Sequence, residues 1–378
     1  MKTSHHTVQK IHLLVLAIAL GLARPGAAQT ASTEITTIAA AARTLLDKLS
    51  DAQRRQAVFD FKDDAQRQRW SNFPTGIFQR QGLRMGDLTQ PQRDAVHALL
   101  AAALSPQGYQ KVMQIVEGDE VLKQSGSQGP GRREDRGPGR PNDGGPGERA
   151  EAGRPGGRGG PGGGLIFGRD EFYVSLLGQP STTEPWMIQF GGHHLAINLT
   201  LVGGRGTLAP SLPAAQPAIY ELKGKTVRPL GREVDKAFAL LSSLNEAQRK
   251  QAILGSQIRD LVLGPGRDGQ TIQPEGIKGA ALTEKQREML LDLASEWTGI
   301  QREAYAEAKL DEMKKHVAET WFAWSGPTEK GGAAYFRIQG PTVHIEFAPQ
   351  RMGGDPGNHI HTIYRDPTND YGAKWWKP

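Results

Sequence analysis

The sequence predicts an α+β protein built from two copies of one unit, each a helical segment followed by an antiparallel β-meander, related by a pseudo-two-fold axis. An internal repeat is the first observation, because residues 49–57 (LSDAQRRQA) recur as residues 244–252 (LNEAQRKQA). The second is that residues 82–93 recur as residues 276–287 at almost the same offset. The third is that strand-like sequence follows both helical segments. A period held over so long a span indicates a duplicated structural unit.

The helical part of each copy carries signals that start helices. Ser50 and Asn245 suit the N-cap of the first repeated helix, and Thr89 and Thr283 precede the second. Apolar residues then recur every three to four positions, which is typical of a helix with one buried face. The helical units are expected at residues 29–124 and 231–319.

The β part of each copy reads as strand, turn, strand, glycine-containing turn and strand. β-branched and aromatic residues form short runs that are separated by Gly, Pro, Ser and Thr. The β units are expected at residues 165–230 and 320–378. Their strands are expected at 171–177, 186–190 and 193–202 in the first copy, and at 320–324, 335–339 and 342–347 in the second.

The N-terminus has the pattern of a secretory signal peptide over residues 1–28. Lys2 and Lys10 are followed by an apolar stretch at 11–22 and by small residues before Gln29. We therefore expect the protein to be exported to the periplasm or the extracellular space. No later stretch is long and apolar enough to predict a membrane span.

Residues 125–164 form a Gly/Pro/Arg-rich insert that is expected to be disordered, because it has almost no apolar side chains to bury. The formal net charge of +6 lies mostly in the signal peptide and in this insert. The remainder of the chain is nearly neutral, which argues against a nucleic-acid partner.

The chain has no cysteine, so disulfides, thiol nucleophiles and thiolate metal sites are excluded.

Histidines supply the most specific candidate site. His359 and His361 alternate at strand spacing, so their imidazoles are expected on one face of a strand. His193 and His194 follow two glycines at the expected start of another strand, where only one of them can face a given pocket. Imidazole ligands favour zinc or copper, and a catalytic zinc often has three protein ligands. We therefore predict a metal site on His359, His361 and one or both of His193 and His194.

Acidic and basic residues near these histidines extend the prediction. Glu346 and Asp370 are expected to be metal ligands, groups that orient an imidazole, or the catalytic base. Arg365 and Asp366, together with His194, are expected to bind a small ligand, since an Arg can hold a carboxylate or a phosphate. The alternative is structural: an Arg–Asp pair that locks the C-terminal loop, and histidines that hydrogen-bond a sheet edge.

Three segments of the chain resemble the signature segments of a mainly bacterial family, domain of unknown function 3500. They are residues 186–195, 340–347 and 358–372, of which the last is the most specific. The likeness covers most of the chain after the predicted signal, except the insert. The resemblance implies kinship and no particular activity. Six residues lie in the signature segments according to this resemblance: His193, His194, His359, His361, Arg365 and Asp370.

Three functional classes agree with these patterns. The first is a metal-dependent hydrolase-like enzyme, in which a bound water is the nucleophile. The second is a non-catalytic protein that binds zinc or copper outside the cytoplasm. The third is a structural or interaction module. A metal ion or a small molecule is the partner expected for the first two classes.

Overall fold

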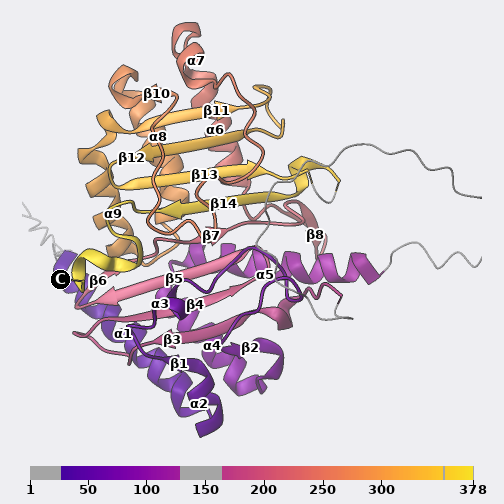
Figure 1. The fold of residues 1–378 in the computed structure, drawn as a ribbon, viewed down its shortest axis with the longest axis vertical. Coiled ribbons are helices and arrows are strands. Elements are labelled where there is room, and N and C mark those ends of the chain that lie inside the picture. The colour runs from indigo at the N-terminus through magenta and orange to yellow at the C-terminus, as the bar shows by residue number, and fades with distance from the viewer. Residues whose placement is uncertain (1–26, 128–163, 352–353, 378) are drawn as a thin grey trace, which may run out of the picture.

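The computed structural model describes residues 27–127, 164–351 and 354–377 (Figure 1). The predicted signal peptide up to residue 26 and most of the predicted insert lie outside these residues. The described chain is a mixed α/β protein with two main sheets and a separate two-stranded hairpin. None of its described helices has the length and apolar character needed to cross a membrane.

In its described residues, the first half of the chain contributes five α-helices and a seven-stranded sheet, in which β3, β4 and β5 form an antiparallel meander. The helix α5 runs to Ser127 and so enters the region expected to be the insert. The helices are α1 (Ala27–Asp47), α2 (Asp51–Ala57), α3 (Asp64–Arg67), α4 (Gln90–Ala103) and α5 (Pro106–Ser127). The strands are β1 (Val58–Phe59), β2 (Leu83–Arg84), β3 (Tyr173–Leu177), β4 (Trp186–Gly192), β5 (Leu195–Val202), β6 (Arg205–Thr207) and β7 (Leu212–Pro213).

The second half has the same order of helices followed by strands, and a five-stranded antiparallel sheet. The hairpin β8 (Tyr220–Leu222) and β9 (Lys225–Val227) precedes it. The helices are α6 (Gly231–Ser243), α7 (Glu246–Ala252), α8 (Glu284–Thr298) and α9 (Glu303–Lys315). The strands are β10 (Ile277–Lys278), β11 (Trp321–Ser325), β12 (Tyr335–Gly340), β13 (Val343–Pro349) and β14 (Ile360–Arg365), and the 3₁₀ segment η6 (Asp370–Trp375) ends the chain.

The repeated sequence makes the same local contacts in both halves. A capping box begins α2 and another begins α7, as the N-cap residues predict. The glutamine of each capping box, Gln53 or Gln248, also forms a side-chain hydrogen bond with a glutamine near the start of the next long helix. The distances are 3.0 Å between Gln92 and Gln53 and 2.9 Å between Gln248 and Gln286. The repeat therefore preserves a helix–helix contact as well as a helix start.

A short segment joins the two sheets edge to edge. Its centre, β7, pairs with β5 of the first sheet. Its ends pair with β14 of the second, where Ser211 N–H donates to Tyr364 O and Ala215 N–H donates to Ile360 O, both at 2.9 Å. In Figure 1 the second sheet accordingly lies above the first in the view, and its edge strand β14 runs next to β7. Side chains from β4, β5 and β14 can therefore meet at this junction.

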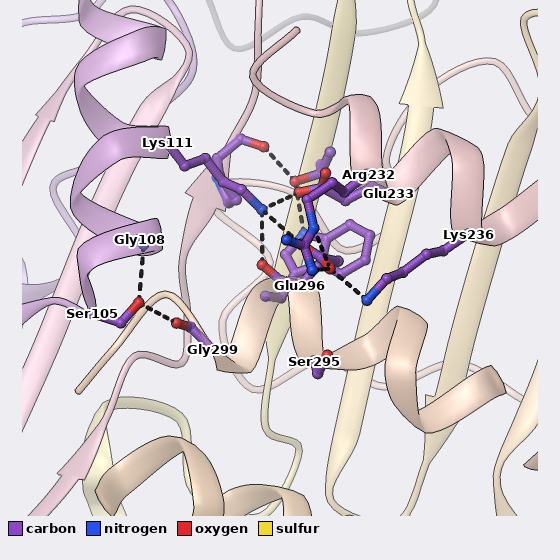
Figure 2. Close-up of polar contacts among 12 residues, drawn as sticks. Ser105, Gly108, Lys111, Arg232, Glu233, Lys236, Ser295, Glu296 and Gly299 are labelled. Atoms are coloured by element: carbon purple, nitrogen blue, oxygen red, sulfur yellow. Dashed lines mark hydrogen bonds and ion pairs between the residues drawn. The ribbon is translucent and has the colours of Figure 1, made fainter. Parts of the chain in front are cut away.

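Helices from the two halves also meet at a buried ion-pair network (Figure 2). Lys111 of α5 contacts Glu233 of α6 and lies 3.7 Å from the carboxylate of Glu296 on α8. Nearby, the Ser105 hydroxyl donates to Gly299 O at 2.6 Å and accepts from Gly108 N–H. A β-carbon at Gly108 would lie only 2.1 Å from Ile300 O, so this helix can approach the neighbouring loop only without a side chain.

Candidate metal centre

Three histidines from distant parts of the chain converge at the junction of the sheets. His194 lies in the turn between β4 and β5, His359 lies just before β14, and His361 lies within β14. The Nε2 atom of His194 is 3.0 Å from that of His359 and 3.3 Å from that of His361. The Nε2 atoms of His359 and His361 are 3.2 Å apart. All three side chains are buried, and we call them the histidine triad.

The sequence prediction for His193 and His194 needs one correction. They were expected at the start of a strand, but they form the two-residue turn between β4 and β5, which begins at Leu195. His194 adopts a φ of 60°, a left-handed conformation that His tolerates better than most side chains. Two-residue turns between antiparallel strands favour residues with a positive φ, so His193 and His194 form a turn and do not continue the strand. His194 joins the triad, whereas His193 does not.

The spacing of the triad matches the requirement of one metal ion. Zinc–nitrogen bonds of about 2.0–2.1 Å at tetrahedral angles separate the nitrogens by roughly 3.3 Å. The observed separations of 3.0–3.3 Å are close to this value. An ion bound by the three nitrogens of this triangle would keep a further coordination position for another ligand. The triad could therefore hold a metal ion.

Electrostatics at the triad favours a neutral imidazole at His194. Burial lowers the pKa of His194 well below 6.5, and the nearby His193, His361 and His359 lower it further. The Nδ1 atom of His194 is buried with no hydrogen-bond partner among the described residues. The centroid of its ring lies 3.7 Å from the ring centroid of His193. A neutral ring with its Nε2 atom aimed at two other Nε2 atoms is suited to donating a lone pair to a cation.

Several polar groups surround the triad and orient its rings. Nδ1 of His361 is 3.1 Å from Oδ1 of Asp260, and the Asn72 amide nitrogen is 3.2 Å from Nε2 of the same ring. Nδ1 of His193 is 2.6 Å from a carboxylate oxygen of Asp119. A carboxylate on the far nitrogen of a metal-binding His fixes its orientation and raises its basicity. No motif in the sequence marks Asn72, Asp260 or Asp119 as part of this site.

Glu346 of β13 lies on the same face of the second sheet as His361 of β14. Its carboxylate contacts other residues. Its buried carboxylate is 2.8 Å from Nε2 of His344 and accepts a hydrogen bond from Tyr335 at 2.8 Å. It also accepts from the backbone N–H groups of Val262 and Leu263 at 2.7 and 2.8 Å. Among the described residues, no carboxylate oxygen joins the histidine triad. Glu346 thus fastens the loop between α7 and β10 to the sheet.

Replacing Glu346 with Gln is expected to lower the free energy of unfolding by about 3 kcal/mol at neutral pH, since it weakens charge-assisted hydrogen bonds in a buried site. Burial opposes ionisation, yet His344 and the two backbone donors bring the pKa of Glu346 below 4.5. A lowered pKa stabilises the fold above the unfolded value, and this stability is lost as the pH falls. Urea unfolding at pH 7 and pH 4 should therefore give a smaller difference between the two proteins at pH 4. A difference that stays constant, or one matched by the exposed control Glu319→Gln, would contradict this role.

Arg365 and Asp370 form the predicted Arg–Asp pair, at 2.9 Å. The Arg365 guanidinium also contacts Asp268 at 3.1 Å and donates to Leu263 O at 2.8 Å. Burial raises the pKa of Asp370 to about 6, although Arg365 opposes this rise. Asp366 instead pairs with Lys309 of α9 at 2.6 Å. These contacts have the geometry of the structural lock that the sequence analysis gave as the alternative to ligand binding.

Comparison with known proteins assigns the chain to a protein family. The family described as "Protein of unknown function (DUF3500)" matches over residues 31–373. No curated protein and no solved structure matches the chain significantly. The match includes all three histidines of the triad. The chain therefore belongs to the family of proteins of unknown function DUF3500, as the three signature segments indicate.

Proposed function

We propose that this protein is an exported metalloprotein that holds one zinc or copper ion on His194, His359 and His361. The observation that carries the proposal is the mutual distance of 3.0–3.3 Å between three buried Nε2 atoms. Hydrogen bonds alone explain this arrangement poorly. An Nε2 atom that carries a proton has no lone pair left to accept a hydrogen bond, so three neutral imidazoles that meet through one nitrogen each cannot link all three pairs. A shared cation removes that difficulty.

The donor set indicates the kind of metal. Three imidazole nitrogens suit zinc and copper, whereas calcium and magnesium prefer oxygen ligands. The chain contains no cysteine, and among the described residues no carboxylate oxygen belongs to the group of candidate ligand atoms that the three histidines form. Asp260 keeps His361 oriented through its Nδ1 atom. Asn72, whose amide lies beside Nε2 of His361, is placed to contact whatever fills the remaining position.

The open position favours a hydrolase-like enzyme over a pure metal carrier. A divalent metal on three histidines acts as a Lewis acid and lowers the pKa of a coordinated water. In this proposal the chain orients the imidazoles and limits access of solvent. Glu346 and Asp370 are then structural groups, because their carboxylates are already engaged away from the triad. The non-catalytic alternative requires a fourth protein ligand, for which the Asn72 amide oxygen is the candidate.

Cobalt substitution distinguishes these alternatives. We expect Co²⁺-loaded protein to show the intense visible bands of a four-coordinate ion, and added azide to shift them by replacing an exchangeable ligand. The Asn72→Ala variant should still show the shift. Bands that do not respond to azide in the parent protein but respond in Asn72→Ala would indicate a closed site and favour metal storage. Absence of any Co²⁺ spectrum would contradict the metal site itself.

Export and the pseudo-two-fold repeat belong to the same proposal. Export is supported by the signal-like sequence at residues 1–28, and sequencing of the mature N-terminus should find Gln29 first. A retained Met1 would contradict it. The repeat is supported by equivalent capping boxes and glutamine contacts in the two halves. An experimental structure whose halves did not superpose over these helices and meanders would contradict it.

A further inference from the structure

An apolar pocket lies between α6 and the second sheet, and we call it the α6 pocket. Its volume is about 110 Å³, comparable with the roughly 150 Å³ at which an apolar cavity in a protein holds one benzene ring. Residues 218–219 and 331–334 also line it, together with Gly357. Ile219 of this lining is 50% exposed, so the pocket opens to solvent there.

The α6 pocket lies on the opposite side of the second sheet from the histidine triad. Ile360 contributes to its lining and is followed in β14 by His361. Adjacent strand residues point to opposite faces of a sheet. Phe336 and Phe347 pair across β12 and β13, and the register places them on the face of Ile360. A ligand here would therefore occupy a site separate from the metal centre, and its binding does not depend on the proposed function.

Aromatic rings supply much of the pocket's lining. Phe336 and Phe347 stack with their ring centroids 4.8 Å apart, and Phe238 of α6 lies 4.9 Å from Trp324 of β11 at near right angles. Phe238 and Phe347 keep exposed fractions of 5% and 3%, and Ile360 keeps 5%, so a molecule in the pocket can touch them. Aromatic rings favour a further ring in a stacked or edge-to-face arrangement. The lining therefore suits one aromatic ring.

Arg228 is the only charged side chain among the described residues that line the pocket. Its side chain is 40% exposed, and Nη1 donates to Oδ2 of Asp235 at 3.0 Å. Nη2 donates to Oδ1 of Asp235 at 3.3 Å and to Gly231 O at 3.4 Å. A guanidinium has five N–H donors, so two of them, on Nε and Nη1, are left without a partner among the described residues. These donors can bind a second carboxylate.

We propose that the α6 pocket binds a small aromatic carboxylate, with its ring against the aromatic lining and its carboxylate at Arg228. The apolar lining excludes a molecule that would bring polar groups into the pocket, because buried polar groups need hydrogen-bond partners. The positive charge of Arg228 disfavours a cationic ligand. A carboxylate at this partly exposed guanidinium would accept charge-assisted hydrogen bonds while the ring leaves water.

Calorimetric titration of the purified protein with benzoate, phenylacetate and 3-phenylpropanoate tests this proposal. Benzyl alcohol keeps the ring without the charge, acetate keeps the carboxylate without the ring, and benzylammonium reverses the charge. We expect at least one of the three aromatic carboxylates to bind about tenfold more tightly than each comparison compound, or better. Equal binding of benzyl alcohol or benzylammonium would overturn the role of the carboxylate, and equal binding of acetate would overturn the role of the ring. Binding of none of the aromatic carboxylates would overturn the site.

A matched arginine pair locates the binding. Arg228→Gln should weaken binding of the best carboxylate by about tenfold or more. Arg232 lies nearby on α6 but does not line the pocket, and it pairs with Glu296 at 2.9 Å. Glu296 keeps Lys236 as a partner at 2.6 Å, so Arg232→Gln should fold and bind the carboxylate as the parent does. An equal loss of affinity in the two variants would contradict the assignment to Arg228.

Filling the pocket gives a second, independent test. Val234 of α6 lines the pocket and is half-buried. Val234→Phe should place a ring of the protein where the ring of the ligand would lie, and so abolish binding. Thermal unfolding checks that this variant is folded, and its unfolding temperature should be no lower than that of the parent. Binding that survives both Arg228→Gln and a folded Val234→Phe would overturn the proposal.

Discussion

Replacing Lys111 with Met is expected to lower the free energy of unfolding by about 3–5 kcal/mol, which is typical when a buried carboxylate loses its cationic partner. Glu233 is completely buried, and Lys111 is the cation that contacts it between α5 and α6. Burial raises the pKa of Glu233, while Lys111 opposes the rise. Urea unfolding at neutral pH should show the loss as a lower midpoint.

Two further variants make this test specific. Lys285 is exposed and pairs with Glu288 on one helix face, so Lys285→Met should cost no more than about 0.5 kcal/mol. Adding Glu233→Leu to Lys111→Met removes the orphaned charge and should recover most of the lost stability. If Lys111→Met cost no more than Lys285→Met, the network in Figure 2 would not be what fastens the two halves together.

Replacing His361 with Ala is expected to weaken zinc binding by on the order of 10²–10⁴-fold, if a total binding free energy of about 10–16 kcal/mol is shared among three or four ligands. Asp260→Asn should weaken it by about 10–100-fold, because Asp260 contacts Nδ1 of His361 and not the Nε2 atom that would bind the ion. Competition with a chromophoric chelator measures both constants. His97 lies on α4 beside Tyr109, so His97→Ala is the control and should have no effect.

The order of effects in this series separates a metal site from a structural cluster. If the triad is a metal site, the loss of zinc affinity is largest in His361→Ala, smaller in Asp260→Asn and smallest in His97→Ala. Equal zinc affinities for His361→Ala and His97→Ala would rule out His361 as a ligand. A fall in thermal stability without any change in zinc affinity would assign the triad to the fold alone.

Much of the fold was predictable because it rests on local signals. The two capping boxes begin α2 and α7 at the residues that the repeat marks. The strands β3, β4 and β5 of the first sheet and β11, β12 and β13 of the second occur within about two residues of the predicted runs. In each meander, neighbouring strands are joined by short connections, so sequence order determines which strands pair.

The candidate site was predictable only where residues share one strand. His359 and His361 could be placed together from their spacing, since alternate strand residues share a face. His194 joins them through a tight turn, and Asn72 and Asp260 reach His361 from loops without periodic sequence. Their positions depend on how the two sheets meet through residues 211–215, which no local pattern encodes. The same holds for the contacts that engage Glu346 and Asp370 elsewhere.

Metal content of the protein purified without a histidine tag tests the central claim most directly. Elemental mass spectrometry should find about one zinc or copper ion per chain in the parent protein. The His359→Ala/His361→Ala variant should carry essentially none, while the His97→Ala control keeps its ion. Equal metal content in the parent and the double variant, or no uptake by a folded parent after metal is supplied, would contradict the account.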